Sequence, residues 1–366
     1  MRRKGGSIFD ELPTSDSEPF AEAYRVLGSA IAERAFPGCA FGLMQSGEVL
    51  LSDALGRFTY EENARAVAPE TIYDIASLTK VVCTTAAAML LYDRGMLDLE
   101  MPLGDLLPGF VIGRSDSRWA RSVRLRHLLA HSSGLPGYVP LFQSAQNATE
   151  VLRGCLEMPL EAEPGTRAIY SDPGFILLGK AIETILGEGL GTWAAREIFA
   201  PLRMSATFFC PAVSLCDFIP PTEEDTTFRH RRIQGVVQDE HAYLLKRVAG
   251  HAGLFSNVTD LLRFSAEILK PKLFRASTIE LFARRQPPPE SSRALGWDTP
   301  SPESSSGTLF SADSIGHLGY SGCSLWIDPE ANLAVALLTN RTWPKRESQL
   351  IKQVRPAFHD ALRQAL

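Results

Sequence analysis

The fold of this chain is decided by Ser77-Leu78-Thr79-Lys80, which is followed by Val81-Val82-Cys83-Thr84-Thr85-Ala86-Ala87-Ala88-Met89-Leu90-Leu91, a run without charge. Such a run predicts a buried helix. A separation of three residues puts Ser77 and Lys80 on the same helical face, so the ammonium group reaches the hydroxyl group. The first turn of a buried helix also supplies positive potential. The stretch therefore predicts a serine and a lysine side by side at the start of a buried helix.

This pair has a catalytic and a structural interpretation. Serine is a weak nucleophile, but a lysine in a desolvated site has a lowered pKa, so that its neutral amine accepts the serine proton. In the structural interpretation, Ser77 caps the helix and Lys80 extends its ammonium group to solvent. Ser-x-x-Lys is a common pattern, and by itself it does not establish catalysis.

A second candidate, Tyr170-Ser171-Asp172-Pro173-Gly174, lies directly before the apolar segment 175–182. Asp at the N-cap followed by Pro at the first helical position commonly begins a helix, so we expect Asp172 to be the N-cap. A tyrosine hydroxyl acts as a base only when nearby cations depress its pKa from about 10. We expect Lys80 to have this effect on Tyr170 across a cleft.

The third candidate is Gly316-His317-Leu318-Gly319-Tyr320-Ser321-Gly322, at the beginning of an expected strand. Its glycines allow close backbone approach, so Gly319 would let a substrate lie against the strand while a main-chain N–H group points at a developing oxyanion. Taken alone, the segment is better explained as a Gly-rich strand start.

Outward from these candidates, the two ends of the chain are both strand-rich. Segments 39–44 and 49–55 flank a Gly-bearing turn, and segments 317–328 and 332–338 flank Pro329-Glu330, so each pair is predicted to be a strand, turn and strand. Residues at helical spacing predict helices over 20–36 and 347–366 at the two ends, and over 81–92, 125–130, 175–186, 193–199 and 260–270 in the middle.

These patterns predict an α/β (α+β) protein in which an antiparallel sheet, flanked by helices, is built from both termini. We place this sheet domain at residues 19–75 and 285–366, a mainly helical domain at 76–284, and an N-terminal extension at 1–18. Ligands usually sit in the cleft between two such domains. The Pro- and Ser-rich segments 211–232 and 285–307 are expected to be long surface loops.

Composition excludes several functions. The 366 residues are 45% hydrophobic and 22% charged, with a net charge of −5, so the chain lacks the basic excess typical of nucleic-acid binding. No run of about 18 apolar residues predicts a membrane span. Arg2-Arg3-Lys4 is not followed by the apolar region of a signal sequence. Cys83 and Cys323 lie in apolar runs, as reduced thiols do. We therefore expect a cytoplasmic protein, with the periplasm as the alternative.

No metal or other cofactor is expected. His127 and His131 have the i, i+4 spacing of zinc ligands but lack the glutamate of His-Glu-x-x-His, so a structural helix end before Gly134 explains them better. His241 and His251 have no evident acidic or cysteine partner by spacing, and we expect them to be loop or packing residues.

Together and in this order, the three candidates resemble the motifs of the serine β-lactamase and penicillin-recognising family: Ser-x-x-Lys, then Tyr-x-Asn or Ser-x-Asn, then Lys-Thr-Gly or His-x-Gly. The second motif begins with a tyrosine, Tyr170, and in this it is similar to the branch of the family that contains class C β-lactamases, DD-peptidases and related esterases. The resemblance covers about residues 20–360. Further segments resemble the same branch: Tyr73-Asp74-Ile75-Ala76, 127–136, 250–256, Gly296-Trp297 and Leu338-Thr339-Asn340-Arg341.

The resemblance implies an acyl-enzyme formed on Ser77, with Lys80 as its base partner and Tyr170 as the proton shuttle. It also implies that the main-chain N–H groups of Ser77 and Tyr320 form the oxyanion hole. Three further residues would lie at the bound substrate: Asp172, His317 and Gly319.

Two departures from the family pattern bear on the substrate. Asp172 stands where the family often has Asn, and an ionised carboxylate cannot donate a hydrogen bond to a substrate carbonyl. His317 stands in place of Lys, so the positive charge that attracts a substrate carboxylate is weak at neutral pH. We therefore expect a serine acyl hydrolase that acts on small neutral esters or amides, with weak DD-peptidase activity.

Three alternatives remain open: a β-lactamase, a non-catalytic ligand-binding or scaffold protein with the same fold, and a metal-dependent hydrolase that uses the histidines. Joint presence of Ser77, Lys80 and Tyr170 argues against the non-catalytic protein, and the histidines lack a coherent ligand set. The sequence does not identify the natural substrate, because specificity in such proteins depends on loops such as 211–232 and 285–307. It does not determine the oligomeric state either.

Overall fold

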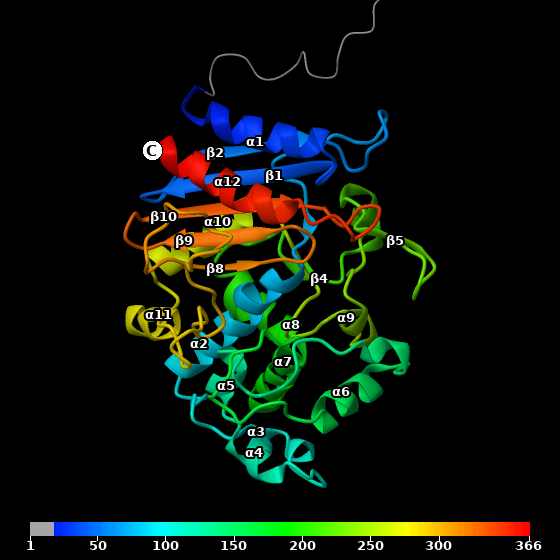
Figure 1. Cartoon of the computed structure of the whole chain (residues 1–366), viewed down its shortest axis with the longest axis vertical. Helices are drawn as coiled ribbons and strands as arrows, with labels where there is room; N and C mark the ends of the chain where they lie inside the picture. Colours follow the sequence, from blue (N-terminus) through cyan, green and yellow to red (C-terminus); the bar gives the residue numbers. More distant parts are fainter. Residues whose placement is uncertain (1–17) are drawn as a thin grey trace, which may run out of the picture.

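The computed structural model describes residues 18–366. Residues 1–17, which contain nearly all of the predicted N-terminal extension and the segment considered as a signal sequence, lie outside the described residues. The central feature is a five-stranded antiparallel sheet with the strand order β2-β1-β10-β9-β8 (Figure 1). Its strands are β1 (Gly38–Gln45), β2 (Glu48–Gly56), β8 (Ile315–Leu318), β9 (Ser324–Asp328) and β10 (Leu333–Thr339).

Both ends of the chain contribute to this sheet, as predicted. The expected hairpin at 39–55 is present, and Ser46 and Gly47 turn it with φ angles of 53° and 85°. The second prediction needs a correction, because segment 317–328 forms two strands rather than one. Gly322, with φ 108°, lies in the tight turn between them, where Gly319 N–H donates to the carbonyl of Cys323. Glycine adopts this backbone conformation without strain.

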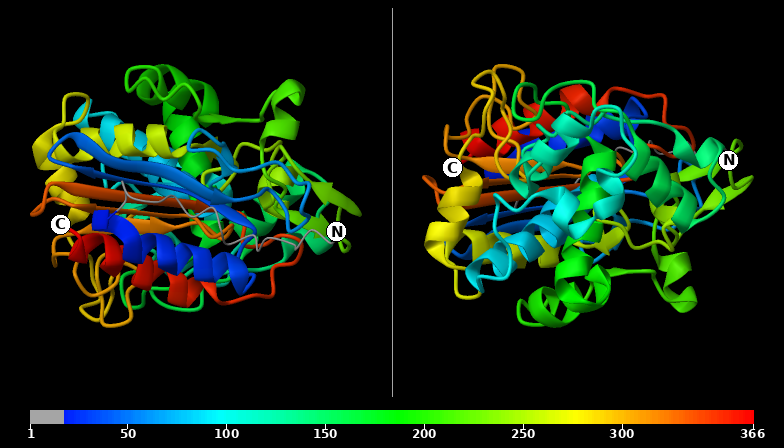
Figure 2. Two further views of the ribbon diagram at one scale, coloured as in Figure 1. Left: turned by 90° about the horizontal axis from the view of Figure 1, so that it is seen from above. Right: turned by 90° about the horizontal axis from the view of Figure 1, so that it is seen from below.

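Helices cover both faces of the sheet. Helices α1 (Ala21–Ala32) and α12 (Ile351–Gln364), from opposite ends of the chain, lie side by side on one face, and α10 (Val258–Leu269) packs against β1 and β10 on the other (Figure 2). Helix α1 ends before the predicted boundary at residue 36, since Arg34 adopts a left-handed conformation with φ 60°. The C-terminal helix begins at Ile351, later than the predicted residue 347.

The lower part of the molecule in Figure 1 is rich in helices. The helix predicted over 81–92 is divided into a π-helix, η3 (Lys80–Thr85), and α2 (Ala86–Asp93), and the 3₁₀-helix η2 (Ala76–Leu78) precedes them. Single π turns within helices are frequent at functional sites. The other α-helices are α3 (Leu103–Leu106), α4 (Ser117–Ser122), α5 (Leu125–Leu129), α6 (Ala148–Glu157), α7 (Asp172–Leu186), α8 (Leu190–Ala194), α9 (Glu240–Leu244) and α11 (Ala276–Ala283).

The remaining described elements are short. Strands β3 (Tyr73–Asp74), β7 (Leu254–Ser256) and β4 (Phe208–Phe209) form a small sheet in that order. Strands β5 (Glu223–Asp225) and β6 (Arg231–Ile233) pair with each other. The short helices are η1 (Glu18–Phe20), η4 (Pro108–Phe110), η5 (Leu141–Gln143), η6 (Ala195–Phe199) and η7 (Val213–Phe218).

The two long segments differ from each other. Segment 211–232 is not a plain loop, because it contains η7, β5 and the first residues of β6. Segment 285–307 is irregular and pairs only through isolated bridges, of which Arg293 with Asp298 is one. No helix among residues 18–366 is both long and apolar enough to cross a lipid bilayer. The mixed α/β class with an antiparallel sheet flanked by helices is confirmed, and the division into two domains stays a prediction.

Candidate active site

Ser77 lies in η2, directly after the short strand β3. Ala76, the first residue of η2, has a left-handed backbone conformation with φ 47°, so the chain turns sharply between β3 and Ser77. The buried carboxylate of Asp74 holds this turn, because it accepts hydrogen bonds from the main-chain N–H groups of Ala76 at 2.9 Å and Gln238 at 2.8 Å. Burial raises the pKa of Asp74 to about 6. The hydroxyl of Ser77 is thus presented by a turn fixed from two sides.

Lys80 is fully buried and its ammonium group has three acceptors. The Nζ atom lies 3.0 Å from Ser77 Oγ, 2.7 Å from Asp172 Oδ1 and 3.0 Å from the carbonyl oxygen of His251. Burial lowers the pKa of Lys80, but the negative charge of Asp172 and the interaction with Tyr170 outweigh it and raise this pKa above the usual value. The expectation of a neutral amine is therefore wrong, because a carboxylate enters the same desolvated site.

Asp172 is the first residue of α7, and the N-cap is Ser171, whose Oγ accepts from Gly174 N–H at 3.1 Å. The predicted cap was therefore wrong by one residue. This shift frees the Asp172 carboxylate to pair with Lys80. Because the pair is neutral as a whole, Asp172 does not add an uncompensated negative charge to the site.

Tyr170 lies between the Ser77 region and two buried histidines. Its hydroxyl group interacts with Lys80 and Ser77, and Lys80 Nζ is 4.9 Å from the centroid of its ring. The imidazole of His131 packs 4.6 Å from the same ring, between centroids. Burial raises the pKa of Tyr170 more than Lys80 lowers it, so this pKa is above its usual value. We expected Lys80 to lower the pKa of Tyr170. That expectation is wrong, because the phenol is buried and its desolvation raises this pKa by more.

His317 lies on β8, and its ring centroid is 5.8 Å from that of Tyr170. Its Nδ1 donates to the carbonyl oxygen of Leu318 at 2.8 Å. Burial, with the nearby cations Lys80 and Arg293, holds the pKa of His317 well below its usual value. The imidazole is therefore neutral at neutral pH, and its pKa is lower than the ordinary value assumed from sequence.

Gly319 brings the end of β8 against the segment that carries Ser77. A Cβ atom at this position would lie 2.5 Å from the carbonyl oxygen of Ile75, so no larger residue fits without a backbone shift. The next residue, Tyr320, lines the same cavity as Ser77. The two predicted oxyanion donors therefore share one cavity.

This cavity, called the Ser77 cavity below, has a volume of about 560 Å³. Of the seven predicted site positions, only buried Lys80 does not line it, although the Lys80 ammonium group contacts Ser77 Oγ. The predicted residues that line it are Ser77, Tyr170, Asp172, His317, Gly319 and Tyr320.

Arg293 was not predicted, yet it also lines the Ser77 cavity. Its guanidinium carbon is 5.2 Å from the centroid of the Tyr170 ring, and its Nη1 lies 3.7 Å from Asp298 Oδ2. It belongs to segment 285–307, whose composition indicated only a surface loop. One feature of the sequence could have pointed to Arg293 as a site residue: it lies three residues before Gly296-Trp297, one of the segments that resemble the family.

The histidines also correct an expectation. His251 does have an acidic partner, since its Nε2 lies 2.8 Å from Asp239 Oδ1. The spacing of His127 and His131 has a structural explanation, as expected: His127 Nδ1 accepts from the main-chain N–H of Arg124 at 3.1 Å.

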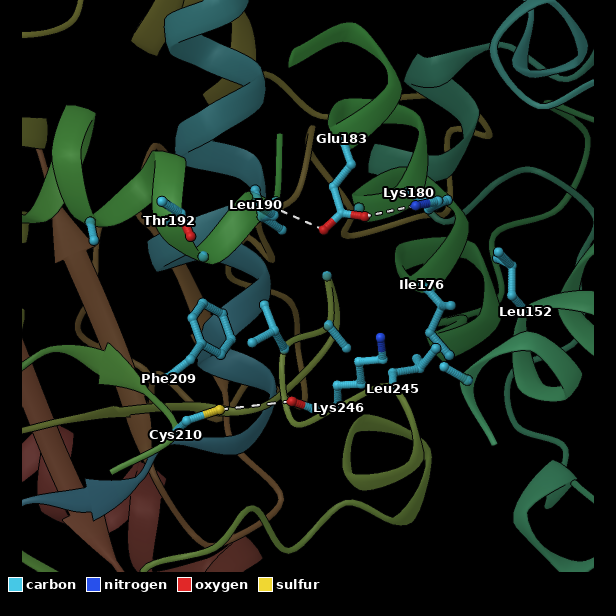
Figure 3. A pocket seen from close by; sticks show the side chains of 18 of the residues that line it. Leu152, Ile176, Lys180, Glu183, Leu190, Thr192, Phe209, Cys210, Leu245 and Lys246 are labelled. Atoms are coloured by element: carbon cyan, nitrogen blue, oxygen red, sulfur yellow. Dashed lines mark hydrogen bonds and ion pairs between the residues drawn. The ribbon is translucent and has the colours of Figure 1, made fainter. Parts of the chain in front are cut away.

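A second cavity, called the α7–α8 cavity below, has a volume of about 700 Å³ (Figure 3), and Ser77 is not among the residues that line it. Its charged residues include Lys180 and Glu183 of α7, which pair with each other at 3.1 Å, and Lys246. Cys210 also lines it, and its thiol contacts only carbonyl oxygens. A paired nucleophile and proton acceptor are not found among the described residues of this cavity.

Comparison with known proteins gives concordant results. The Beta-lactamase family model matches residues 21–356. The chain is 30% identical over 342 residues to an N-acetylmuramyl-L-alanine amidase of Bacillus subtilis strain 168, covering 84% of this chain and 77% of that protein. It is 29% identical over 301 residues to a protein of Escherichia coli strain K12 named as a D-alanyl-D-alanine carboxypeptidase, covering 74% and 69%.

A solved structure with a similar fold is that of EstCE1, described as a hydrolase with promiscuous acyltransferase activity. The TM-score is 0.76 with 21% sequence identity, and the match covers 94% of this chain and 99% of EstCE1.

Proposed function

The chain belongs to the beta-lactamase family, and from this membership we propose that it is a serine acyl hydrolase that forms a covalent acyl-enzyme on Ser77. The observation that carries the proposal is the position of Lys80. Its ammonium group is buried, bonded at once to Ser77 Oγ and Asp172 Oδ1, and lies against Tyr170 at the edge of an open cavity.

Tyr170 accepts the proton in this proposal. Asp172 raises the pKa of Lys80, so in this proposal the lysine is protonated at neutral pH and acts through its charge. The ammonium group instead stabilises the phenolate of Tyr170, which is the reactive minor form. Ser77 Oγ attacks the substrate acyl carbon while its proton passes to the phenolate oxygen. The sequence-based assignment of Lys80 as base is thereby replaced by a role in holding charge.

The remaining steps use the same groups. The tetrahedral oxyanion is bound by the main-chain N–H groups of Ser77 and Tyr320. As the carbonyl re-forms, the leaving alcohol or amine takes the proton from the Tyr170 hydroxyl. Water then attacks the acyl-enzyme, gives one proton to Tyr170, and the departing Ser77 oxygen takes that proton back. One bond to the acyl carbon forms and one breaks in each half of the reaction.

Small esters and amides are the proposed substrates, and amides that carry a carboxylate are a second candidate class. The neutral Asp172–Lys80 pair does not repel an anion, and Arg293 adds a positive charge to the cavity wall. The two relatives named as an amidase and a carboxypeptidase support this second class. β-Lactams carry the same combination of amide and carboxylate and remain an alternative within it.

Intact-mass measurement tests the nucleophile. Wild-type protein should gain the mass of one fluorophosphonate adduct, and the Ser77→Ala variant should gain none while retaining its circular dichroism spectrum. Exposure to a penicillin in a parallel sample reports whether a β-lactam acylates the same serine. Labelling of Ser77→Ala at the wild-type rate would refute the proposal.

Arg293→Gln tests the second substrate class. It should raise KM for a D-Ala-D-Ala peptide by about tenfold and leave kcat/KM for a neutral p-nitrophenyl ester within about twofold, because only the peptide has a carboxylate to lose its partner. Arg153→Gln, at an exposed arginine of α6, is the matched control and should change neither substrate. Equal losses on ester and peptide would show that Arg293 supports Tyr170 rather than the substrate.

A further inference from the structure

Asp239, His241 and His251 form a cluster beside the Ser77 cavity. One ligand atom from each of the three side chains lies within 4.8 Å of the other two. The two histidines are almost fully buried, at 3% and 1% exposure, and Asp239 lines the Ser77 cavity. We propose that these three side chains bind a divalent transition metal ion, and that the ion is zinc.

The fold holds the three side chains from one short stretch of chain. Asp239 is the N-cap of α9 and accepts from Ala242 N–H at 2.7 Å, which fixes its carboxylate. His251, from the segment before β7, lies 2.8 Å from the same carboxylate. Tyr138 packs against His241, with ring centroids 5.5 Å apart. Each side chain is thus held by contacts that do not depend on a bound ion.

Two nitrogen atoms of the cluster are unexplained by contacts within the described chain. His241 Nε2 and His251 Nδ1 are both buried and have no hydrogen-bond partner among residues 18–366. Buried polar atoms nearly always have a partner, and a bound ion would supply one to His241 Nε2, whereas His251, whose Nε2 lies 2.8 Å from Asp239, would offer that Nε2 to the ion. His131 and His317 also have an unpartnered Nε2, but in the described structure neither belongs to a group of three metal-ligating side chains.

The donor set favours zinc. Two imidazoles and one carboxylate are ligands typical of zinc sites that keep one position open, whereas Mg²⁺ and Ca²⁺ prefer oxygen ligands alone. Zinc holds such atoms about 2.0–2.2 Å away, so ligands now within 4.8 Å need only a small side-chain adjustment to share an ion. The Asp239 side chain is 23% exposed and lines the Ser77 cavity, so an ion could reach the cluster from that cavity.

The site is distinct from the acyl-transfer groups but adjoins them. The carbonyl oxygen of His251 is one of the three acceptors of the Lys80 ammonium group. The metal proposal does not rest on the proposed hydrolase, because none of its three ligands forms or breaks a bond to the acyl group. The absence of a metal was expected from sequence spacing, and that expectation did not include Asp239.

The test is zinc binding by the full chain. Protein stripped with EDTA and dialysed is titrated with ZnCl₂ by calorimetry, and bound zinc is counted by mass spectrometry of the metal. We expect one zinc per chain, and MgCl₂ in place of ZnCl₂ should bind at least about a hundredfold more weakly. His241→Gln and Asp239→Asn should each weaken zinc binding by about tenfold or more.

Two controls complete the experiment. His230→Gln removes an exposed histidine outside the cluster, and Ser77→Ala removes the proposed nucleophile; both should bind zinc like the wild type. The melting temperature gives a second readout. Zinc should raise the melting temperature of the wild type and should not raise that of folded His241→Gln. The proposal is overturned if the wild type binds no stoichiometric zinc, if magnesium binds equally, or if both ligand variants retain wild-type affinity.

Discussion

The Ser77 cavity and the α7–α8 cavity are of similar size, and both use residues of α7. The first has the N-terminal end of this helix, where Asp172 faces buried Lys80, and the second has the middle of the helix, where Lys180 and Glu183 pair near solvent. The Lys80 side chain is fully buried, whereas the Lys180 side chain is 45% exposed. The larger cavity is therefore the one without desolvated ionisable groups.

This difference is why we place the proposed reactive site in the Ser77 cavity, because convergence of buried polar groups indicates such a site better than volume does. In water, an ion pair such as Lys180 with Glu183 is screened and changes little around it. In the desolvated site, the Asp172 charge raises the pKa of Lys80 and also, directly, the pKa of Tyr170. Substitutions in the two cavities should therefore have very different consequences.

The largest effect is expected for Ser77→Ala. It should reduce kcat for ester hydrolysis by at least about a thousandfold, because it removes the proposed acyl acceptor. Cys210→Ala, which removes the thiol of the α7–α8 cavity, should leave kcat within about twofold. Steady-state kinetics on a p-nitrophenyl ester measures both. If Cys210→Ala were the inactive variant, the active site would have to be moved to the second cavity.

Lys80→Ala and Tyr170→Phe come next, each with an expected loss of about a hundredfold or more in kcat. Their losses should not add in the double variant, because the two side chains act as one proton-transfer unit. Single-turnover acylation rates of the two single variants and the double variant give the coupling energy between Lys80 and Tyr170. Strictly additive losses would indicate that the two residues act separately.

Asp172→Asn should change the pH dependence. Wild-type kcat/KM should rise with pH above neutrality, because the reactive form is the deprotonated Tyr170 and its pKa is raised. The Asp172 charge raises that pKa directly, and in Asp172→Asn the forming phenolate beside Lys80 still favours the protonated lysine, so the rising limb should move toward lower pH. A pH–rate profile of both proteins checks the sign. A limb that moves to higher pH would contradict the proposed base.

Gly319→Ala should have a moderate effect on stability and activity. Its Cβ would meet the Ile75 carbonyl oxygen, with an expected cost of about 1–3 kcal/mol and about a tenfold loss of kcat as the Tyr320 N–H moves. Gly189 of the α7–α8 cavity has φ −67° and no atom within 4 Å of an added Cβ, so Gly189→Ala should cost less than about 1 kcal/mol. Urea unfolding compares the two.

The smallest effect is expected for Lys180→Ala. An exposed ion pair within a helix contributes little, so the free energy of unfolding should fall by less than about 0.5 kcal/mol and ester turnover should not change. The same urea titration and ester assay apply. A loss of activity in this variant would show that the α7–α8 cavity is coupled to the Ser77 site.

Local patterns predicted most of the secondary structure. The hairpin at 39–55, the buried helix after Lys80 and the mixed α/β class follow from apolar periodicity and turn residues, which act over a few neighbouring positions. The errors are local too: the helix at 20–36 ends early at Arg34, and strand 317–328 is divided by a turn at Gly322. Such boundaries depend on single backbone conformations that composition does not reveal.

The sequence by itself determined the family and the residues Ser77, Lys80 and Tyr170 as candidates, because their order and local spacing are properties of the linear chain. Only the tertiary structure decided their charges. Asp172 is far from Lys80 in sequence, yet its carboxylate lies 2.7 Å from the buried ammonium group. Arg293 and Asp239 reach the same cavity from other segments. Desolvation and Coulomb energy depend on distance in space, so no pattern along the chain could give the protonation state of the site.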